Sequence, residues 1–341
     1  MRRIILLGNP GSKRTIWFEK AAREQEVPLE LLDWKEWDRM LPEGVLYFKI
    51  DPPLWESSAL EELKELTRAY KEDLSVLACR AEKGSVEFLN EPQAIRMLLD
   101  KRRCKKRLME SDLPVTEFLC ENDKIQSTDQ LLSAMKRQKI WQVFVKPVYG
   151  SGAAGVSAFR LQPGTGKMCL YTCALLLPGT GLVNTKKLQS YTRAEEIRSL
   201  LDRILGLDCV VERWYPKASH NGYSYDLRAV VQRGQVDYLL ARMSRGPITN
   251  LHLNNHPLPV EALGLPVLVQ ERIRTLCQRA MECFPGLQSA GIDLLLEKGS
   301  LSPRIIEMNA QGDLIYQDLY DQNQIYRRQA VWMKAWLSKP E

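Results

Sequence analysis

Three observations predict an α/β fold, of the mixed α+β kind, for this sequence. The chain has 341 residues, of which 45% are apolar, and this is enough for a large core divided among two or three compact units. Strand-like and helical patterns alternate near its start. Further along, strands recur between turns, and one late pair forms a predicted hairpin.

Residues 1–88 are predicted to form a small parallel α/β unit, because strands separated by helices favour that arrangement. The first strand leads into the turn Asn9-Pro10-Gly11-Ser12. A phosphate-binding loop needs four residues between its glycines and a Lys directly after the second, so we expect only a strand-to-helix turn near a substrate. The strand-like runs are 4–8, 45–50 and 76–78, and the helical patterns lie near 15–25 and over 58–70.

The rest of the chain is predicted to alternate helices with strands up to a closing helix. Pro114 ends the first helical pattern, because proline breaks a helix interior. Ser127 and Thr128 are candidate N-caps for the next. The helical patterns are 91–111, 128–138 and 315–337, and the strands are 115–119, 142–146, 156–159, 168–177, 208–214, 225–232 and 236–243.

Residues 291–309 form a predicted β-hairpin around a turn at Ser300. Side chains on a strand alternate between its faces, so Glu307 and Asn309 share one face. If the hairpin is symmetric about Ser300, Asp293 lies directly opposite Glu307, with β-carbons about 5 Å apart. A divalent cation would turn their repulsion into attraction, and oxygen ligands suit Mg²⁺. The alternative is an amphipathic hairpin whose polar face meets water.

Charge and cysteine content limit the classes of partner. The net charge of +6 suits a protein that handles phosphates or acidic substrates. The basic run 101–107 contains no interleaved aromatic residues, so we interpret it as a solvated helix face and expect no nucleic-acid partner. Eight cysteines without a CxxC pair predict reduced thiols in a cytoplasmic protein. No apolar stretch approaches the roughly 20 residues of a membrane span, so no membrane partner is expected.

A series of short motifs follows one another in a definite order. The motifs are Asp100-Lys101, Phe144-Val145-Lys146-Pro147, the glycine loop 150–155, the segment 210–215, Asp226-Leu227-Arg228, Arg242 with 248–252, and Asp293 with Glu307-Met308-Asn309. This ordered set resembles the ATP-grasp superfamily, in particular the branch that contains glutathione synthetase and the ligases that add glutamate to ribosomal protein. The resemblance covers about 90–330.

The resemblance implies an ATP-grasp fold with three parts. A small N-terminal pre-ATP-grasp α/β domain would cover 1–88. A central lid subdomain would cover 89–207, and a C-terminal subdomain that carries the metal and catalytic groups would cover 208–341. These two α+β subdomains would clamp ATP between them.

The resemblance also implies a role for each motif. Lys101 and Lys146 would contact the phosphates of ATP, and the glycine loop would close over them with its backbone amides. Mg²⁺, with Mn²⁺ as an alternative, would be bound by Asp293, Glu307 and Asn309. The implied catalytic groups are Arg242, Asn250 and Arg228, and the other implied nucleotide contacts are Gly150, Ser151, Gly152, Ala153, Glu212, Arg213, Trp214, Tyr215 and Asp226.

The implied activity is that of an ATP- and Mg²⁺-dependent carboxylate–amine ligase that works through an acyl phosphate and releases ADP and phosphate. The implied partners are a carboxylate and an amine, each from a small molecule or a peptide, and a homo-oligomer is left open. The alternatives are an ATP-grasp kinase or other phosphotransferase and a non-catalytic ATP-binding regulator. One departure concerns the acceptor side: the family usually has Pro-Gly after its metal-binding Asn, whereas Ala310 and Gln311 follow Asn309 here.

Overall fold

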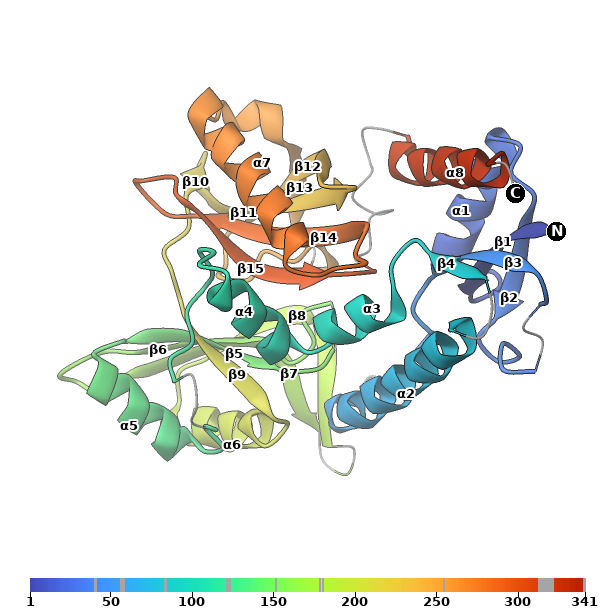
Figure 1. Ribbon diagram of the computed structural model, residues 1–341. Helices are drawn as coiled ribbons and strands as arrows, with labels where there is room; N and C mark the ends of the chain where they lie inside the picture. The colour runs from blue at the N-terminus through green and yellow to red at the C-terminus, as the bar shows by residue number, and fades with distance from the viewer. Residues whose placement is uncertain are drawn as a thin grey trace.

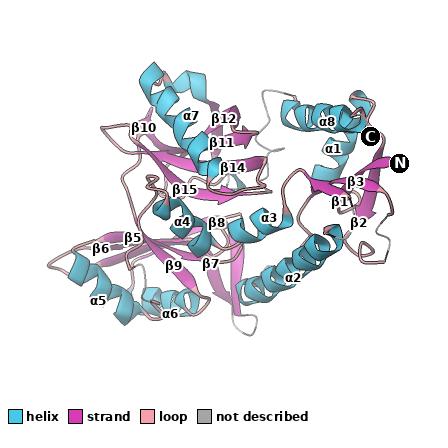
Figure 2. Ribbon diagram, in the orientation of Figure 1, coloured by secondary structure: helices cyan, strands magenta, loops and turns pink. Residues whose placement is uncertain are grey.

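The computed structural model describes residues 1–39, 42–55, 59–82, 85–120, 124–150, 152–177, 179, 181–253, 255–311 and 322–339. Within these residues the chain forms three β-sheets, each with helices packed against it (Figure 1), and Figure 2 shows how helices and strands are distributed among them. None of the helices in this part of the chain combines the length and the apolar composition that crossing a membrane requires.

The first sheet confirms a parallel α/β unit at the start of the chain. Its strands run parallel in the order β2-β1-β3-β4. From Ile4 to Leu7, β1 is at most 1% exposed, which explains its continuous apolar run. The elements are β1 Arg2–Gly8, α1 Lys13–Glu24, β2 Leu29–Asp33, β3 Val45–Ile50, a 3₁₀ turn Leu60–Glu62, α2 Leu63–Ala81 and β4 Val86–Phe88.

The predicted strand at 76–78 is wrong, because these residues belong to α2. Leu74 and Leu77 are buried whereas Val76 is 44% exposed, so burial follows the helical spacing of three to four residues. An apolar run of three residues is too short to reveal its period. The third predicted strand is replaced by β4, which pairs with β3.

The predicted helix over 91–111 is divided into α3 Pro92–Leu98 and α4 Lys101–Glu110. Asp100 separates the two as the N-cap of α4. Its carboxylate accepts hydrogen bonds from the amides two and three residues later, which satisfies donors that the first helical turn leaves unpaired. The cap makes Lys101 the first residue of α4.

The second sheet, which we call the lid sheet, is antiparallel in the order β8-β7-β6-β5-β9. Helices α5 and α6 share one apolar core with it. The predicted boundary at 207/208 falls just before β9, and β9 pairs with β5 of this sheet. The elements are α5 Thr128–Gln138, β5 Gln142–Pro147, β6 Ser157–Leu161, β7 Met168–Leu177, β8 Gly181–Tyr191, α6 Ala194–Leu205 and β9 Cys209–Arg213.

The third sheet, which we call the C-terminal sheet, has the order β13-β12-β11-β14-β15, and β10 pairs with β11. The predicted closing helix over 315–337 begins at residue 324 as α8, and 312–321 lie outside the described residues. The elements are β10 Ser219–His220, β11 Tyr223–Gln232, β12 Gln235–Ser244, 3₁₀ turns Leu251–Leu253 and Val260–Leu263, β13 His256–Pro259, α7 Val267–Glu282, β14 Ser289–Leu296, β15 Pro303–Asn309 and α8 Gln324–Leu337.

Helix α8 returns to the start of the chain. It packs on α1 of the N-terminal unit, where the rings of Phe18 and Tyr326 meet edge to face with centroids 5.5 Å apart. The two helices lie next to each other in Figure 1. The N-terminal unit is therefore completed by a helix from the far end of the sequence.

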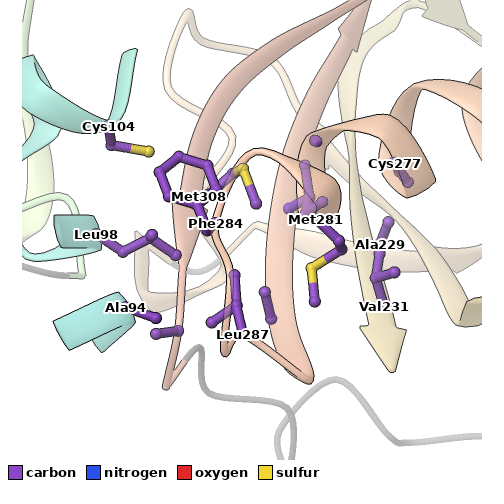
Figure 3. Packing of buried hydrophobic residues seen from close by; sticks show 14 of the residues in the cluster. Ala94, Leu98, Cys104, Ala229, Val231, Cys277, Met281, Phe284, Leu287 and Met308 are labelled. Carbon is purple, nitrogen blue, oxygen red and sulfur yellow. The ribbon is translucent and has the colours of Figure 1, made fainter. Parts of the chain in front are cut away.

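A continuous core joins the N-terminal unit to the C-terminal sheet. Figure 3 shows Leu98 of α3, Met308 of β15, Met281 of α7 and the nearby Phe284 gathered in it. Close packing of this kind fixes the relative positions of the elements. As a result, α4 is held against β15, and the helix that carries the predicted phosphate lysine lies beside the predicted metal strand.

Candidate functional site

A small cavity with charged walls lies between the lid sheet and the C-terminal sheet. Its volume is about 10 Å³, which leaves room for roughly one water molecule. The lining residues are Lys101, Cys104, Lys105 and Leu108 of α4, Lys146 of β5, Glu212 of β9, and Ile306, Glu307 and Met308 of β15. Both predicted phosphate lysines and one predicted metal ligand therefore meet in one place.

Lys101 connects the glycine loop to β15. Its Nζ donates to the carbonyl of Gly150 at 2.5 Å and lies 3.3 Å from Oε1 of Glu307. The position of this ammonium group follows from the Asp100 cap, because Lys101 is the first residue of α4.

The glycine loop has a backbone that few side chains tolerate. Gly150, Gly152, Ala153 and Gly155 have φ angles between +65° and +110°, a region that favours glycine. Backbone of this kind forms concave sets of N–H groups that bind anions. Ser151, the other predicted contact in the loop, lies outside the described residues.

Glu212 forms the buried centre of the lid side. Its Oε2 lies 2.8 Å from Nζ of Lys146 and its Oε1 lies 2.6 Å from Nζ of Lys105, while the hydroxyl of Thr116 donates to Oε2 at 2.7 Å. Burial would raise the pKa of Glu212, but the two lysines outweigh it and lower that pKa to about 2. Burial lowers the pKa of Lys105 to about 8, against the opposing effect of Glu212.

Lys105 is a site residue that the interpretation of 101–107 as a solvated face does not single out. Lys105 is only 4% exposed. Lys101, Lys105 and Leu108 are spaced by four and three positions, which places them on one face of a helix. This spacing, with an apolar residue on the same face, is the sequence signal that could have indicated that Lys105 is buried beside Lys101.

The linker after β9 places aromatic and cationic groups together. Trp214 packs on Phe144 with ring centroids 5.3 Å apart. The guanidinium groups of Arg213 and Arg304 lie 5.0 and 4.4 Å from the ring centroid of Tyr215. The backbone amides of Arg213 and Trp214 already donate to carbonyl groups elsewhere in the protein.

A row of paired charges crosses one face of the C-terminal sheet. Across neighbouring strands, Asp226 is opposite Arg242, Arg228 is opposite Asp293, and Asp293 is opposite Glu307. The predicted pairing of Asp293 with Glu307 is therefore confirmed. Nε of Arg242 lies 2.7 Å from Oδ1 of Asp226, and its Nη2 lies 3.2 Å from Oδ2 of Asp293. Arg228 forms a second ion pair with Asp293.

The two arginines keep Asp293 ionised. Burial would raise the pKa of Asp293, but Arg228 and Arg242 outweigh it and lower that pKa to about 2. Gly291 leaves space for this arrangement, because a β-carbon there would lie 3.0 Å from Nη1 of Arg228. Glycine at this position therefore allows the guanidinium group to lie over β14.

Asp226, a predicted nucleotide contact, is engaged within the protein. Besides its ion pair with Arg242, Asp226 forms an ion pair with Lys217, whose Nζ lies 3.6 Å from Oδ2 of Asp226. Asp226 also accepts a hydrogen bond from the hydroxyl of Thr249. Lys217 also donates to Thr249 at 2.8 Å. Thr249 belongs to the motif 248–252, whereas Lys217 is not singled out by the sequence patterns. Asn250, a predicted catalytic residue, directly follows Thr249 at the end of this charged row.

The donor set on β14 and β15 fits a hard divalent cation. Asp293, Glu307 and Asn309 all offer oxygen, and Glu307 and Asn309 lie two residues apart on one strand. Among the described residues, no three His, Cys, Asp or Glu side chains gather where they could hold a metal ion. A cation here would need the amide of Asn309 together with phosphate or water oxygens, which is how Mg²⁺ is commonly bound.

The segment after Asn309 docks onto the N-terminal unit. Gln311 donates to the carbonyl of Ile50 at 2.7 Å, and its side-chain oxygen accepts from the hydroxyl of Tyr70 at 2.8 Å. Its own carbonyl accepts from Arg14 at 2.7 Å. The strand order reverses between β1 and β3, and the carboxyl ends of strands at such a point are where parallel sheets bind ligands.

Comparison with known proteins agrees with this architecture. No family model and no curated protein matches the sequence. The ATP-grasp ligase PsnB in complex with a minimal precursor matches with a TM-score of 0.60 at 13% identity, over 98% of this chain and 99% of that chain. The D-alanine–D-alanine ligase of Bacillus anthracis in complex with ATP matches with a TM-score of 0.58 at 12% identity, over 98% and 95%.

A third solved structure is the macrocyclase MdnC bound with precursor peptide MdnA from Microcystis aeruginosa MRC. It matches with a TM-score of 0.60 at 12% identity, over 98% of this chain and 100% of that chain. At identities this low, a likeness establishes the fold and leaves the activity to be argued from the site. The chain has the ATP-grasp fold.

Proposed function

We propose that this chain is an ATP- and Mg²⁺-dependent carboxylate–amine ligase, with an acyl phosphate as intermediate and ADP and phosphate as products. The observation that carries the proposal is the cavity shared by Lys101, Lys146 and Glu307, with Asp293 opposite Glu307. Two ammonium groups and two carboxylates at the junction of two sheets are what a triphosphate and its cation need.

Nucleotide binding would exchange carboxylate partners for phosphate. Lys101 would leave Glu307 and Lys146 would leave Glu212, and both would contact phosphate oxygens. Lys105 would stay on Glu212, so the buried carboxylate would keep a counter-charge. The glycine loop would add its backbone amides.

The chemistry needs position and charge more than covalent participation. A substrate carboxylate oxygen bonds to the γ-phosphorus of ATP as the bond from that phosphorus to the β-phosphate oxygen breaks, and ADP leaves. An amine nitrogen then bonds to the acyl carbon, phosphate departs, and the amine proton passes to solvent. Arg242 and Asn250 stabilise negative charge in both steps. Mg²⁺, when held by Asp293, Glu307 and Asn309, offsets charge on the phosphate oxygens.

Several features bear on the finer assignment. The strand segment Asp226-Leu227-Arg228 favours the branch of glutathione synthetase and the glutamate-adding ligases. PsnB and MdnC are described with precursor peptides, so we include peptides beside small molecules as acceptors. The carboxyl ends of β1 and β3, beside Gln311, are the proposed entry for the acceptor. All eight cysteines are free, which favours the cytoplasm.

The test is a screen for ADP release with pooled acids, amines and peptides, followed by mass spectrometry of the product. We expect ADP release that requires both an acid and an amine. Hydroxylamine in place of the amine should give a hydroxamate, which reports an acyl phosphate. A phosphorylated hydroxyl product without hydroxamate would establish a phosphotransferase instead. ATP binding without turnover across the whole panel would establish a regulator.

A further inference from the structure

A short segment of the N-terminal unit lies against the lid sheet. We call residues 59–63 the latch. Ala59 forms a β-bridge with Val183 of β8, and the amide of Leu182 donates to the carboxylate of Glu61 at 2.8 Å. The latch is thus joined to the start of β8 through both backbone and side chain.

The latch also contributes to the core of the lid. Leu60 and Leu63 are 2% and 8% exposed and pack in the core formed by the lid sheet with α5 and α6. Every other fully buried member of that core among the described residues lies between 119 and 211. Two leucines from the N-terminal unit therefore complete the core of a different unit.

The same leucines touch the glycine loop. A β-carbon on Gly150 would lie 3.0 Å from Cδ1 of Leu63, and one on Gly155 would lie 3.3 Å from Cδ1 of Leu60. The amide of Gly155 donates to the side chain of Asn184 at 3.2 Å, one residue beyond the bridge to the latch. Loop, latch and β8 therefore form one connected set of contacts.

We propose that Leu60, Glu61 and Leu63 are positioning residues for the glycine loop, through which the N-terminal unit sets the affinity for ATP. This rests on the proposed function. The latch holds the loop backbone in its left-handed shape before the nucleotide arrives, so binding does not have to supply the entropy of ordering the loop. None of the three side chains needs to touch the nucleotide.

The test compares Leu60→Ala and Glu61→Ala with the unaltered protein. Amide hydrogen exchange is followed at 152–155 in the free protein, and the Kd for the analogue AMP-PNP is measured by calorimetry. We expect faster exchange in both variants and a Kd raised about fivefold or more, the scale of coupling between connected sites. kcat at saturating ATP and the KM for the acid should change little. Leu60→Met and Glu61→Gln, which keep an apolar side chain and a hydrogen-bond acceptor, should retain most of the protection of the loop and most of the affinity for AMP-PNP.

Two matched variants separate positioning from general destabilisation. Leu77→Ala removes a leucine that is 1% exposed in the core of the N-terminal unit. Glu62→Ala removes the neighbouring exposed carboxylate, which makes no capping hydrogen bond. Both should leave loop exchange and Kd unchanged. Unchanged exchange in Leu60→Ala, or equal effects in Leu77→Ala, would overturn the proposal.

Two further outcomes are also decisive. If Leu60→Ala fails to fold, Glu61→Ala decides the question, because Glu61 is exposed and its loss does not open a cavity. If the unaltered protein binds no nucleotide, the proposed function fails, and the exchange comparison at 152–155 still supports or overturns the positioning role.

Discussion

At the scale of single residues, the site consists of carboxylates that buried cations hold ionised. Glu212 has two lysines, and Asp293 has two arginines. In each group the charges are buried, so the attraction between carboxylate and cations offsets a large desolvation cost. Removing one partner would leave an uncompensated buried charge. The stability of the protein should therefore depend on the pH at which these carboxylates take up protons and on any substitution that removes one of the paired charges.

We expect the free energy of unfolding to decrease as the pH is lowered from 4.5 towards 2. The ordinary pKa of the Glu212 carboxyl is 4.5 and its pKa in the folded protein is about 2, so the unfolded chain takes up that proton first. The stabilisation is complete above pH 4.5 and is lost as the pH falls through the folded pKa, at most roughly 3 kcal/mol for this group. Denaturant titrations across this range should show a weaker pH dependence in Glu212→Gln. Equal dependence in both proteins would contradict the ion pairs described here.

Glu307→Gln should greatly reduce turnover while leaving the fold intact. Its side chain is 24% exposed, and Lys101 keeps the carbonyl of Gly150 as an acceptor, so no buried charge is left alone. We expect Mg²⁺-dependent ADP release to fall about a hundredfold or more, the scale of several kcal/mol of lost charge stabilisation. Thermal unfolding and ADP release measure the two effects. Full activity in this variant would remove Glu307 from the metal site.

Asp293→Asn should differ from Glu307→Gln in its effect on stability. It leaves Arg228 and Arg242 without their shared carboxylate, so we expect the free energy of unfolding to decrease by about 3–5 kcal/mol. Chemical denaturation of both variants provides the measurement. Equal stability of the two would mean that the arginines find other partners.

At the scale of elements, α4 is the helix on which the proposed nucleotide site depends. Asp100 caps it, and Lys101 and Lys105 project from it. We expect Asp100→Ala to lower stability by about 1 kcal/mol, the usual cost of a lost N-cap. It should also raise the KM for ATP, because the first turn loses its anchor. Asp100→Asn, which can still cap, is the control. If KM is the same in all three proteins, the cap does not position Lys101.

The pairing of Asp293 with Glu307 could be predicted from the sequence, whereas other parts of the site could not. A hairpin symmetric about Ser300 places Asp293 opposite Glu307, and the two residues do pair. Nearer the turn, however, Leu296 pairs with Pro303, and a register shift between Asp293 and Leu294 moves the pairing by one residue. The spacing of Lys101, Lys105 and Leu108 places Lys105 on the face of the site, but its counter-charge Glu212 lies far along the chain and cannot be identified from a local pattern. The residues 76–78 were assigned wrongly because a short apolar run fits both periods.

At the scale of the whole molecule, the cavity of about 10 Å³ is too small for a nucleotide, so the proposed function requires the lid sheet and the C-terminal sheet to separate. The latch attaches the lid sheet to the N-terminal unit, and a continuous core attaches that unit to the C-terminal sheet. The segment 114–119 also joins the two sheets directly, because the amide of Thr116 donates to the carbonyl of Ile305 at 3.0 Å and the amide of Arg213 donates to the carbonyl of Glu117 at 2.8 Å. Helix α5 packs on the lid sheet and α7 packs on the C-terminal sheet, so the distance between these two helices reports the separation of the sheets (Figure 1).

This geometry predicts an increase in the distance between α5 and α7 when AMP-PNP is added. Spin labels on unnatural amino acids at the exposed positions Lys136 and Arg272 would report it by pulsed electron resonance. A control pair at Val76 and Val331, both exposed in the N-terminal unit, should show no change. A constant distance between Lys136 and Arg272 at saturating nucleotide would rule out this opening.

The packing of α8 on α1 has a consequence for how the protein is made. During synthesis, β1 and α1 leave the ribosome well before α8, so α8 cannot cover the apolar surface around Phe18 until it has also emerged. Contacts so distant in sequence form slowly, because a long loop must close before they can form. The N-terminal unit is thus completed only after residues 324–337 have been made, and until then its uncovered apolar surface is open to aggregation.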